Sequence, residues 1–400
     1  ARASGLPGVI IAGQNGPGAT NLVTGVAQAD AAFSPVISIA GAISSKDVGK
    51  NTFQEIDQQA LFEPITKKTW TINKADKIQE VFHDAFKLAL TPRCGPVHIN
   101  LPRDILSSNT NFTELNKKQN DPLPVASIDV LSKTIDIILT SSQPVIIAGG
   151  GIKNTNGYQE VINLAKILNI PIVASAGHGD VIPSGESLYA GQMGPRGNPV
   201  ASKLVKEADV ILALGTRLGF NSTFFSYENI NKQASIIQVE IDPIALGRYF
   251  PIAIGICADA KTVAKQLYDQ ISKKKEIIKI EKWTQLFIKD RKNYLRIRDD
   301  NAEINKTPIQ PSGLFKTLRD VLPKNTAVTL DAGTLCLQAT DMLNYSAPPS
   351  LFTPLDFGLV GFSFACGLGV KLAKPDSPVI SLMGDGGFGM TISELSTAVQ

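Results

Sequence analysis

Cysteine is scarce in this chain of 400 residues: Cys94, Cys257, Cys336 and Cys366 lie far apart and form no CxxC pair. This spacing argues against a disulfide framework or a zinc site, and it makes a cytoplasmic location the default expectation. An excess of charge of one sign is lacking too, because 39 lysines and arginines stand against 36 acidic residues, a net charge of +3. Neither nucleic acid nor an acidic membrane surface is therefore an expected partner.

Long apolar runs are also missing, so the sequence predicts no membrane span, and its first residues do not have the pattern of a signal peptide. The sequence starts at Ala1 rather than Met and ends at Gln400 inside a helix-like pattern. We therefore expect a fragment of a longer protein, with part of any active site contributed by residues outside this sequence. With 43% hydrophobic and 19% charged residues, it is typical of a globular protein of two or three domains.

One pattern recurs along the chain: a short β-branched or apolar run, a turn with glycine, and then an amphipathic helix pattern. This alternation predicts an α/β fold with parallel sheets that helices cover on both faces. The runs predicted to be strands are 8–13, 34–41, 95–102, 144–151, 170–176, 208–215, 234–242, 326–333 and 377–386.

Two polar stretches separate these runs into blocks. The first, SSNTNFTELNKKQNDPLP (107–124), has few large apolar residues, and the second, from 273 to 310, is rich in charge and predicts a helix with a connector. The predicted organisation is a domain over 1–108, a central domain over 122–272, a linker over 273–310 and a last domain over 311–400.

The sequence SLMGDGGFGM (381–390) places one carboxylate between glycines, where an apolar run meets a helix pattern. Ligands bind at the C-terminal ends of parallel strands, and the free N–H groups of a helix start attract phosphate. Glycine lets the backbone approach a ligand closely, and a carboxylate is a suitable Mg²⁺ ligand beside a diphosphate. Asp385 is therefore a candidate metal ligand, although an ordinary turn capped by Asp explains the same residues.

Several segments in order resemble the thiamine diphosphate-dependent enzymes of the acetolactate synthase group. They cover nearly the whole chain, and the ordered set is more specific than any one motif. The segments are GQNGPGATNLVTGVAQA (13–29), TFQEIDQQALFEPITKKTW (52–70), GPVHINLPRDI (95–105), ADVILALGTRL (208–218), IIQVEIDP (236–243) and GDGGFGMTISELSTAV (384–399).

The resemblance implies three parallel-sheet domains: a first that binds the pyrimidine of the cofactor, a central one similar to a Rossmann fold, and a last that binds the diphosphate. It also implies that the first and last domains are truncated in this sequence. It implies thiamine diphosphate and Mg²⁺ as cofactors, a small keto acid as substrate, and a homodimer or homotetramer with the cofactor between subunits. In the family, a Glu before the first strand activates the cofactor and an Asn after the Gly-Asp-Gly turn completes the metal site. Neither is found in this sequence.

The resemblance also assigns site residues. Gln54 and Phe53 would face the reacting carbon, with Gln54 hydrogen-bonding a substrate oxygen; the alternative is a surface Gln beside a core Phe. Val360 would lie under the bent cofactor, and the alternative is core packing. The residues implied to bind the cofactor are Gly333, Thr334, Gly358, Val360, Gly384, Asp385, Gly386 and Gly387, with Asp385 also binding the metal.

The central domain resembles a region that holds FAD in acetolactate synthases, holds ADP in related enzymes, or stays empty. The residues implied for a nucleotide are Gly150, Gly151, Arg217 and Asp242. The charged run that follows this Arg in flavin-binding members is absent, since the sequence continues LGFNSTFF. FAD is therefore a weaker expectation than thiamine diphosphate.

The resemblance leaves more than one reaction open. The expected one is decarboxylation of a pyruvate-like 2-keto acid with carboligation, as in acetolactate synthase; the alternatives are sulfoacetaldehyde acetyltransferase or another lyase of the group. From a different class, an NAD-binding dehydrogenase or a non-catalytic nucleotide-binding subunit stays possible. A dehydrogenase should carry GxGxxG directly after its first strand, and this sequence does not.

Overall fold

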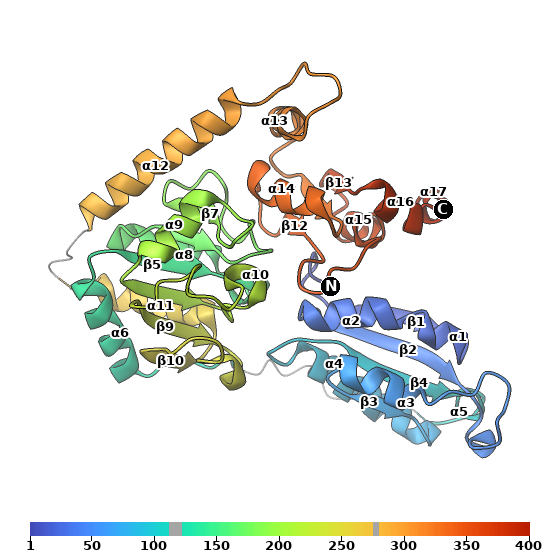
Figure 1. Cartoon of the computed structure of the whole chain (residues 1–400). Coiled ribbons are helices and arrows are strands. Elements are labelled where there is room, and N and C mark those ends of the chain that lie inside the picture. The colour runs from blue at the N-terminus through green and yellow to red at the C-terminus, as the bar shows by residue number, and fades with distance from the viewer. Residues whose placement is uncertain (112–121, 275–279) are drawn as a thin grey trace. The chain divides into compact units, whose positions relative to one another are not determined.

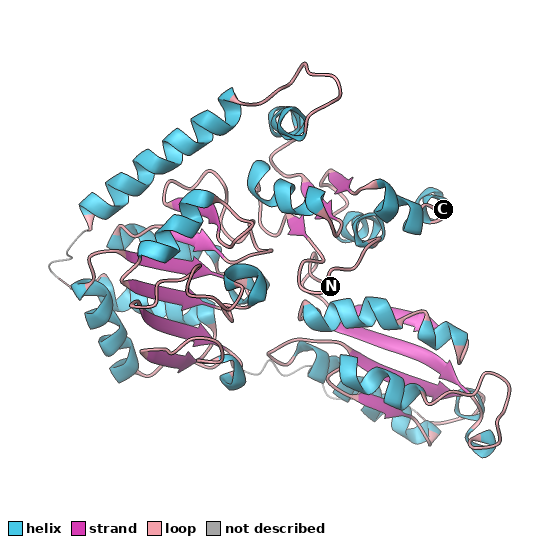
Figure 2. Ribbon diagram, in the orientation of Figure 1, coloured by secondary structure: helices cyan, strands magenta, loops and turns pink. Residues whose placement is uncertain are grey.

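The computed structural model describes residues 1–111, 122–274 and 280–400. The chain divides into two compact units, Ala1–Asp121 with Asp356–Leu359, and Pro122–Leu355 with Val360–Gln400. Parts of the polar stretch 107–124 and of the predicted linker 273–310, namely 112–121 and 275–279, lie outside the described residues. Figure 1 labels the elements, and Figure 2 shows parallel strands flanked by helices in each of three sheets.

The first unit holds a four-stranded parallel sheet with the order β1-β2-β4-β3. Its central strands are apolar and buried, as expected of strands covered on both faces. The strands are β1 (Gly8–Ala12), β2 (Val36–Ala42), β3 (Thr69–Thr71) and β4 (Val97–Pro102). The helices are α1 (Pro17–Thr20), α2 (Val23–Ala31), α3 (Gln58–Phe62), α4 (Ile78–Leu90) and α5 (Arg103–Leu106).

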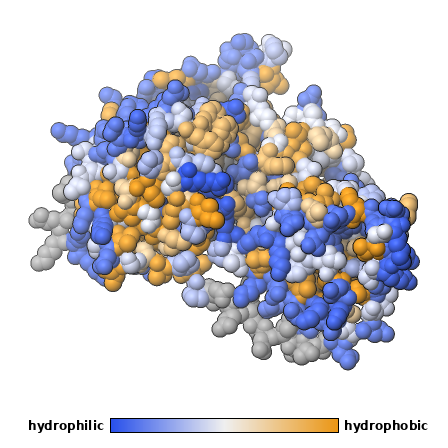
Figure 3. All heavy atoms as spheres, turned by 60° about the horizontal axis from the view of Figure 1, so that its bottom comes forward, coloured by the Kyte–Doolittle hydropathy of each residue, from blue (hydrophilic) through white to orange (hydrophobic). Residues whose placement is uncertain are grey.

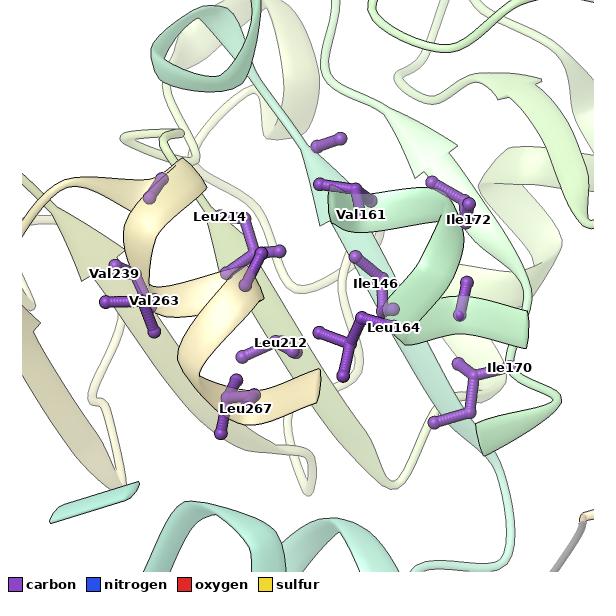
Figure 4. Close-up of a cluster of buried hydrophobic side chains, with 14 of the residues drawn as sticks. Ile146, Val161, Leu164, Ile170, Ile172, Leu212, Leu214, Val239, Val263 and Leu267 are labelled. Carbon is purple, nitrogen blue, oxygen red and sulfur yellow. The ribbon is translucent and has the colours of Figure 1, made fainter. Parts of the chain in front are cut away.

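The central part of the second unit is a six-stranded parallel sheet with the order β10-β9-β8-β5-β6-β7. Figure 4 shows how α8 and α11 cover one of its faces: Val161 and Leu164 from α8, and Val263 and Leu267 from α11, pack over the strands. The strands are β5 (Pro144–Ala148), β6 (Ile172–Ala174), β7 (Tyr189–Gln192), β8 (Val210–Leu214), β9 (Ser235–Glu240) and β10 (Ile254–Cys257). The helices are α6 (Ile128–Thr140), α7 (Gly150–Asn154), α8 (Tyr158–Leu168), α9 (Pro199–Glu207), α10 (Phe220–Thr223) and α11 (Ala260–Ile271).

The helix α12 (Glu281–Asp300) lies within the predicted 273–310 linker, and it is more than a connector. Its Trp283 and Phe287 are buried in the apolar cluster of the central part, and the indole Nε1 of Trp283 donates to Pro144 O at 3.1 Å. One face of this charged helix is therefore part of the core, while the boundaries proposed between the three domains stay a prediction.

The C-terminal part of the second unit carries a three-stranded parallel sheet with the order β12-β11-β13. The strands are β11 (Ala327–Leu330), β12 (Leu351–Phe352) and β13 (Val379–Leu382). The helices are α13 (Pro311–Val321), α14 (Thr334–Met342), α15 (Phe362–Ala373), α16 (Asp385–Thr391) and α17 (Glu394–Val399).

A buried ion pair joins the central part to β12 within the second unit. Lys153 Nζ lies 2.8 Å from Asp180 Oδ1, and their side chains are 7% and 0% exposed. The other carboxylate oxygen of Asp180 accepts hydrogen bonds from Ser350 N at 2.8 Å and Leu351 N at 2.9 Å, while Lys153 also donates to Leu351 O. Burial alone would raise the pKa of Asp180, but the charge of Lys153 and these donors outweigh it and hold the pKa below its usual range.

The predicted α/β class with parallel sheets is confirmed, and each run predicted to be a strand contains one. The sequence analysis missed β3, β7, β10 and β12, each of which lies at the edge of its sheet. No helix in the described ranges is long and apolar enough to cross a membrane. On the face drawn in Figure 3, apolar areas are interspersed with hydrophilic ones.

Candidate functional site

The turns that follow β11 and β13 lie at the same edge of the C-terminal sheet. The two strands are paired in parallel with Leu330 opposite Leu382, and Asp331 N donates to Leu382 O at 3.0 Å. Helix α14 begins directly after the first turn, with Gly333 as its N-cap, and α16 begins after the second, with Gly384 as its N-cap. Two helix starts therefore meet at the C-terminal edge of neighbouring strands, where α/β folds bind ligands.

The glycines beside Asp385 are not explained by packing or by backbone conformation. A Cβ added at Gly384 or at Gly386 would meet no atom within 4 Å, and neither residue has a positive φ. Both glycines and Asp385 are exposed. Glycine at an exposed position that the fold does not require leaves the backbone without a side chain, and this allows a ligand to approach it closely.

Gly387, in contrast, is required by the fold itself. A Cβ at this position would lie 2.9 Å from both Cγ and Oδ1 of Asp331. The four residues of this turn that were predicted to bind the cofactor therefore fall into two groups. Gly387 is needed for packing, and the other three are exposed.

The turn after β11 offers a second exposed backbone. Gly333 has a φ of +133° and open space where a Cβ would lie, and Thr334 is exposed as the first residue of α14. No side chain caps this helix. Cys336 N donates to Gly333 O at 3.1 Å, and N–H groups of a helix start that lack such a partner remain for a ligand or water. Backbone N–H and the Thr334 hydroxyl are suitable donors for phosphate oxygens.

Asp385 is the carboxylate of this edge that is available to a cation. Among the residues that the structure describes, no group of three His, Cys, Asp or Glu side chains could hold a metal ion. Mg²⁺ commonly takes one or two carboxylates and fills its other positions with phosphate oxygens and water. Asp385 thus fits a metal carried in with a diphosphate and does not form a complete protein site.

Val360 and Gly358 lie on the loop between β12 and α15. Val360 is 41% exposed, so it is not an ordinary core valine, which was the alternative explanation for it. Gly358 has a φ of +83°, and a Cβ added there would meet no atom within 4 Å. Gly358 belongs to the first compact unit, whereas Val360 belongs to the second.

In the first unit, the structure brings the two predicted segments together at Gln54. Asn15 Nδ2 donates to Gln54 O at 3.1 Å, and Gln14 Nε2 donates to Gln54 Oε1 at 3.0 Å. Gly16 approaches so closely that a Cβ there would lie 2.7 Å from Gln54 O, and both residues have a positive φ. Phe53 next to them is 83% exposed, so it is not a core residue here.

A buried polar network that the sequence analysis did not predict supports this turn. Gln58 Oε1 accepts from Gly16 N at 3.2 Å, and Gln58 Nε2 donates to Gly41 O at 3.1 Å and to Asn100 Oδ1 at 2.7 Å. The same Asn100 oxygen lies 2.9 Å from His98 Nε2. Gln58 has no recognisable spacing signal in the sequence, because it begins α3 whereas Gln54 lies in a turn before that helix.

His98 ends this network in the core. It is fully buried in β4, its Nδ1 lies 3.0 Å from Ser38 Oγ, and its ring stacks on Phe62. Burial lowers the pKa of His98 to about 4, and the contact with Asn100 opposes this only in part. The imidazole is therefore neutral at pH 7, with Nε2–H donating to Asn100 and Nδ1 accepting from Ser38.

The nucleotide candidates of the central part are engaged in local structure. A Cβ at Gly151 would lie 2.8 Å from Gly215 Cα, and a Cβ at Gly150 would lie 2.9 Å from the His178 ring. Gly151 N already donates to Gly215 O at 2.9 Å. Gly151 is explained by contact with the turn after β8, and Gly150 by contact with His178 in the turn after β6, without a ligand.

The other two nucleotide candidates lie after β8 and β9. Asp242 Oδ1 accepts from Ile244 N at 2.9 Å and caps the short helical turn that follows. Arg217 is half-buried in the turn after β8. The geometry of the four residues thus gives FAD no specific support.

Comparison with protein-family models gives three matches in chain order. The N-terminal thiamine pyrophosphate (TPP)-binding domain of thiamine pyrophosphate enzymes matches residues 1–61, and their central domain matches residues 131–267. Their C-terminal TPP-binding domain matches residues 331–400. None of these matches points to FAD.

Comparison with curated proteins finds relatives along the whole chain. A "Probable acetolactate synthase large subunit" of Methanococcus aeolicus is 32% identical over 100% of this chain and 69% of the relative. A protein of the same name from Methanocaldococcus jannaschii is 35% identical over 99% of this chain and 68% of the relative. A sulfoacetaldehyde acetyltransferase of Alcaligenes xylosoxydans xylosoxydans is 32% identical over 100% of this chain and 70% of the relative.

Proposed function

Because this chain belongs to the thiamine diphosphate-dependent enzymes of the acetolactate synthase type, we propose that it catalyses Mg²⁺- and thiamine diphosphate-dependent decarboxylation of a pyruvate-like 2-keto acid, with carboligation to a second carbonyl compound. The observation that carries the proposal is the bare backbone of Gly384 and Gly386 on either side of exposed Asp385. Neither packing nor backbone conformation requires these glycines, and close approach by a diphosphate held by a cation would account for them.

The residues divide the work as follows. Asp385 holds Mg²⁺, while the N–H groups near Gly384 and Gly386 and at Gly333–Thr334 bind diphosphate oxygens. Thiamine diphosphate, when bound, supplies the electron sink that decarboxylation needs. Val360 would contact the bound cofactor, the Gly358 carbonyl would accept a hydrogen bond from its amino group, and Gln54 would hydrogen-bond a substrate oxygen beside Phe53.

The assembly we propose is a homodimer or homotetramer, in which the first unit of one subunit and the C-terminal part of another share a cofactor. Sedimentation of the full-length protein should give a dimer or larger species that thiamine diphosphate and Mg²⁺ stabilise. A monomer that still turns over a keto acid would contradict this arrangement.

A pair of glycine substitutions on α16 tests the cofactor site. Gly386→Ala and Gly389→Ala both add a methyl into open space on the same helix, and both should stabilise the helix by about 0.5–1 kcal/mol. Gly386→Ala should nevertheless weaken cofactor binding, because in the proposed site its methyl would lie between the helix start and the diphosphate. Calorimetry of full-length protein with thiamine diphosphate and Mg²⁺ would show this, with Gly389→Ala as the matched control.

Asp385→Ala should abolish the part of the cofactor affinity that depends on Mg²⁺. We expect the titration of this variant with thiamine diphosphate to become the same with and without the metal. Unchanged Mg²⁺-dependent affinity would reject the site and, with it, the proposed function.

A second reaction has support of its own, because a sulfoacetaldehyde acetyltransferase is as similar to this chain as the first relative is. Full-length protein should therefore be assayed for CO₂ release from pyruvate, and separately for phosphate-dependent consumption of sulfoacetaldehyde. Release of CO₂ without a need for phosphate supports the keto acid reaction. Acetyl phosphate formed only from sulfoacetaldehyde and phosphate would replace it with the second reaction.

A further inference from the structure

Asp331 is a buried carboxylate to which the sequence analysis gave no role. It directly follows β11, it is 3% exposed, and it is the first residue of the DAGT turn. Its Oδ1 accepts from Gly361 N at 3.0 Å, and its Oδ2 accepts from Ser363 N at 2.8 Å. Both oxygens are therefore committed to the first turn of α15.

The same carboxylate touches α16. The closeness of Gly387 leaves no room for a Cβ, which would lie 2.9 Å from Asp331 Cγ. Asp331 belongs to the turn after β11 that carries Gly333, and its side chain contacts two further segments: the start of α15 next to Val360 and the helix that begins at Asp385.

A layer of hydroxyl groups beneath Asp331 fixes the same segments. Ser363 Oγ donates to Thr329 O at 2.9 Å, and Thr329 Oγ1 lies 2.8 Å from Ser381 Oγ. These contacts connect α15 to β11 and β13. A buried carboxylate stays in such a place because charge-assisted hydrogen bonds and the positive end of a helix offset its desolvation.

We propose that Asp331 is a positioning residue, which sets the spacing between Val360 and the Gly384–Asp385–Gly386 turn. The proposal rests on the function proposed above, because that function gives both segments a contact with one cofactor. Asp331 does not bind the cofactor or its metal itself, since its two oxygens are engaged and it is buried away from solvent.

The position of α15 follows from the same contact. The N–H groups of Gly361 and Ser363 at its start are taken by Asp331, so these two donors are not available to the diphosphate. In the proposed site, the diphosphate would therefore bind at the starts of α14 and α16. Asp331 precedes α14 by three residues and contacts Gly387 of α16, so it sets the distance between these two helix starts.

The test compares Asp331→Asn with Gly387→Ala in full-length protein. The first replaces one acceptor oxygen with an amide that faces a backbone N–H, and the second keeps the carboxylate but displaces α16 from it. Both should lower affinity for thiamine diphosphate with Mg²⁺ by about tenfold or more. Because the two substitutions act through one contact, the affinity of the double variant should fall by much less than the product of the two single fold-losses in affinity.

Hydrogen exchange gives a readout that does not depend on activity. In Asp331→Asn, the amides of 361–363 should exchange faster without cofactor, while those of the central sheet stay unchanged. A purely structural role predicts a smaller folded fraction with normal affinity and a normal turnover number per cofactor-loaded site.

The outcomes separate the two proposals. If the wild type does not bind thiamine diphosphate, the proposed function fails. If the wild type binds it and both variants bind it equally well, or if their losses multiply, the positioning role is wrong and the proposed function survives. Should Asp331→Asn not fold, Gly387→Ala alone still decides, since wild-type affinity in that variant overturns the proposal.

Discussion

The ion pair of Lys153 and Asp180 should decide how firmly β12 is held to the central part of the chain. With side chains 7% and 0% exposed, this pair belongs to the class in which removal of one partner costs about 3–5 kcal/mol. Lys153→Met leaves the buried carboxylate without its cation. The backbone N–H groups of Ser350 and Leu351 still donate to it, but they do not carry a full charge.

Hydrogen exchange at Ser350 and Leu351 measures this cost locally, which suits a chain of several domains better than a global unfolding curve. A loss of about 3–5 kcal/mol corresponds to exchange that is about 10²- to 10³-fold faster or more. Asp180→Asn should have a comparable effect, because it leaves the ammonium buried while keeping one acceptor oxygen. The double variant removes both charges, so its cost should be well below the sum of the two single costs.

The matched control is Lys203→Met, which breaks a pair of similar length, 2.7 Å from Asp290 Oδ2, with side chains 47% and 33% exposed. We expect a change of at most about 1 kcal/mol there. Our reasoning is refuted if Lys153→Met accelerates exchange no more than this control does, or if the double variant loses as much as both single variants together.

The remaining predictions concern pH and the Gln54 turn. Since the folded pKa of Asp180 lies below its ordinary value, its contribution is present above the unfolded pKa and lost as pH falls through the folded pKa, so exchange at Ser350 should accelerate only in acid. Burial lowers the pKa of His98 to about 4 in the folded protein, so its ring NMR signals should not move between pH 8 and 5. About 3 kcal/mol of the free energy of unfolding should be lost as pH falls from the ordinary pKa of 6.5 to 4. Ring signals that titrate near pH 6.5 would contradict the burial of His98. Gly16→Ala should cost about 1–3 kcal/mol, since φ is +56° and the methyl would meet Gln54 O, whereas Gly25→Ala has open space and should be neutral or stabilising in thermal melts.

The candidate site was predictable from sequence where its residues are contiguous. The Gly-Asp-Gly turn after an apolar run predicted a bare backbone with one acid at a strand end, and the structure places Asp385 there at the start of α16. Asp331 lies in the run 326–333 that the sequence analysis predicted to be a strand, yet its contacts with 361, 363 and 387 were not predictable. No periodicity connects residues so far apart in the chain.

The sequence by itself determined the parallel α/β architecture, because buried central strands need continuous apolar runs. Each such run can be recognised from a few consecutive residues. It did not determine the edge strands β3, β7, β10 and β12, which are short and depend on a neighbour for their pairing. Nor did it determine which glycines serve packing, as Gly387 does, and which stay bare, as Gly386 does. Those distinctions belong to the tertiary structure, since they depend on which atoms of distant segments come within van der Waals distance after the chain has folded.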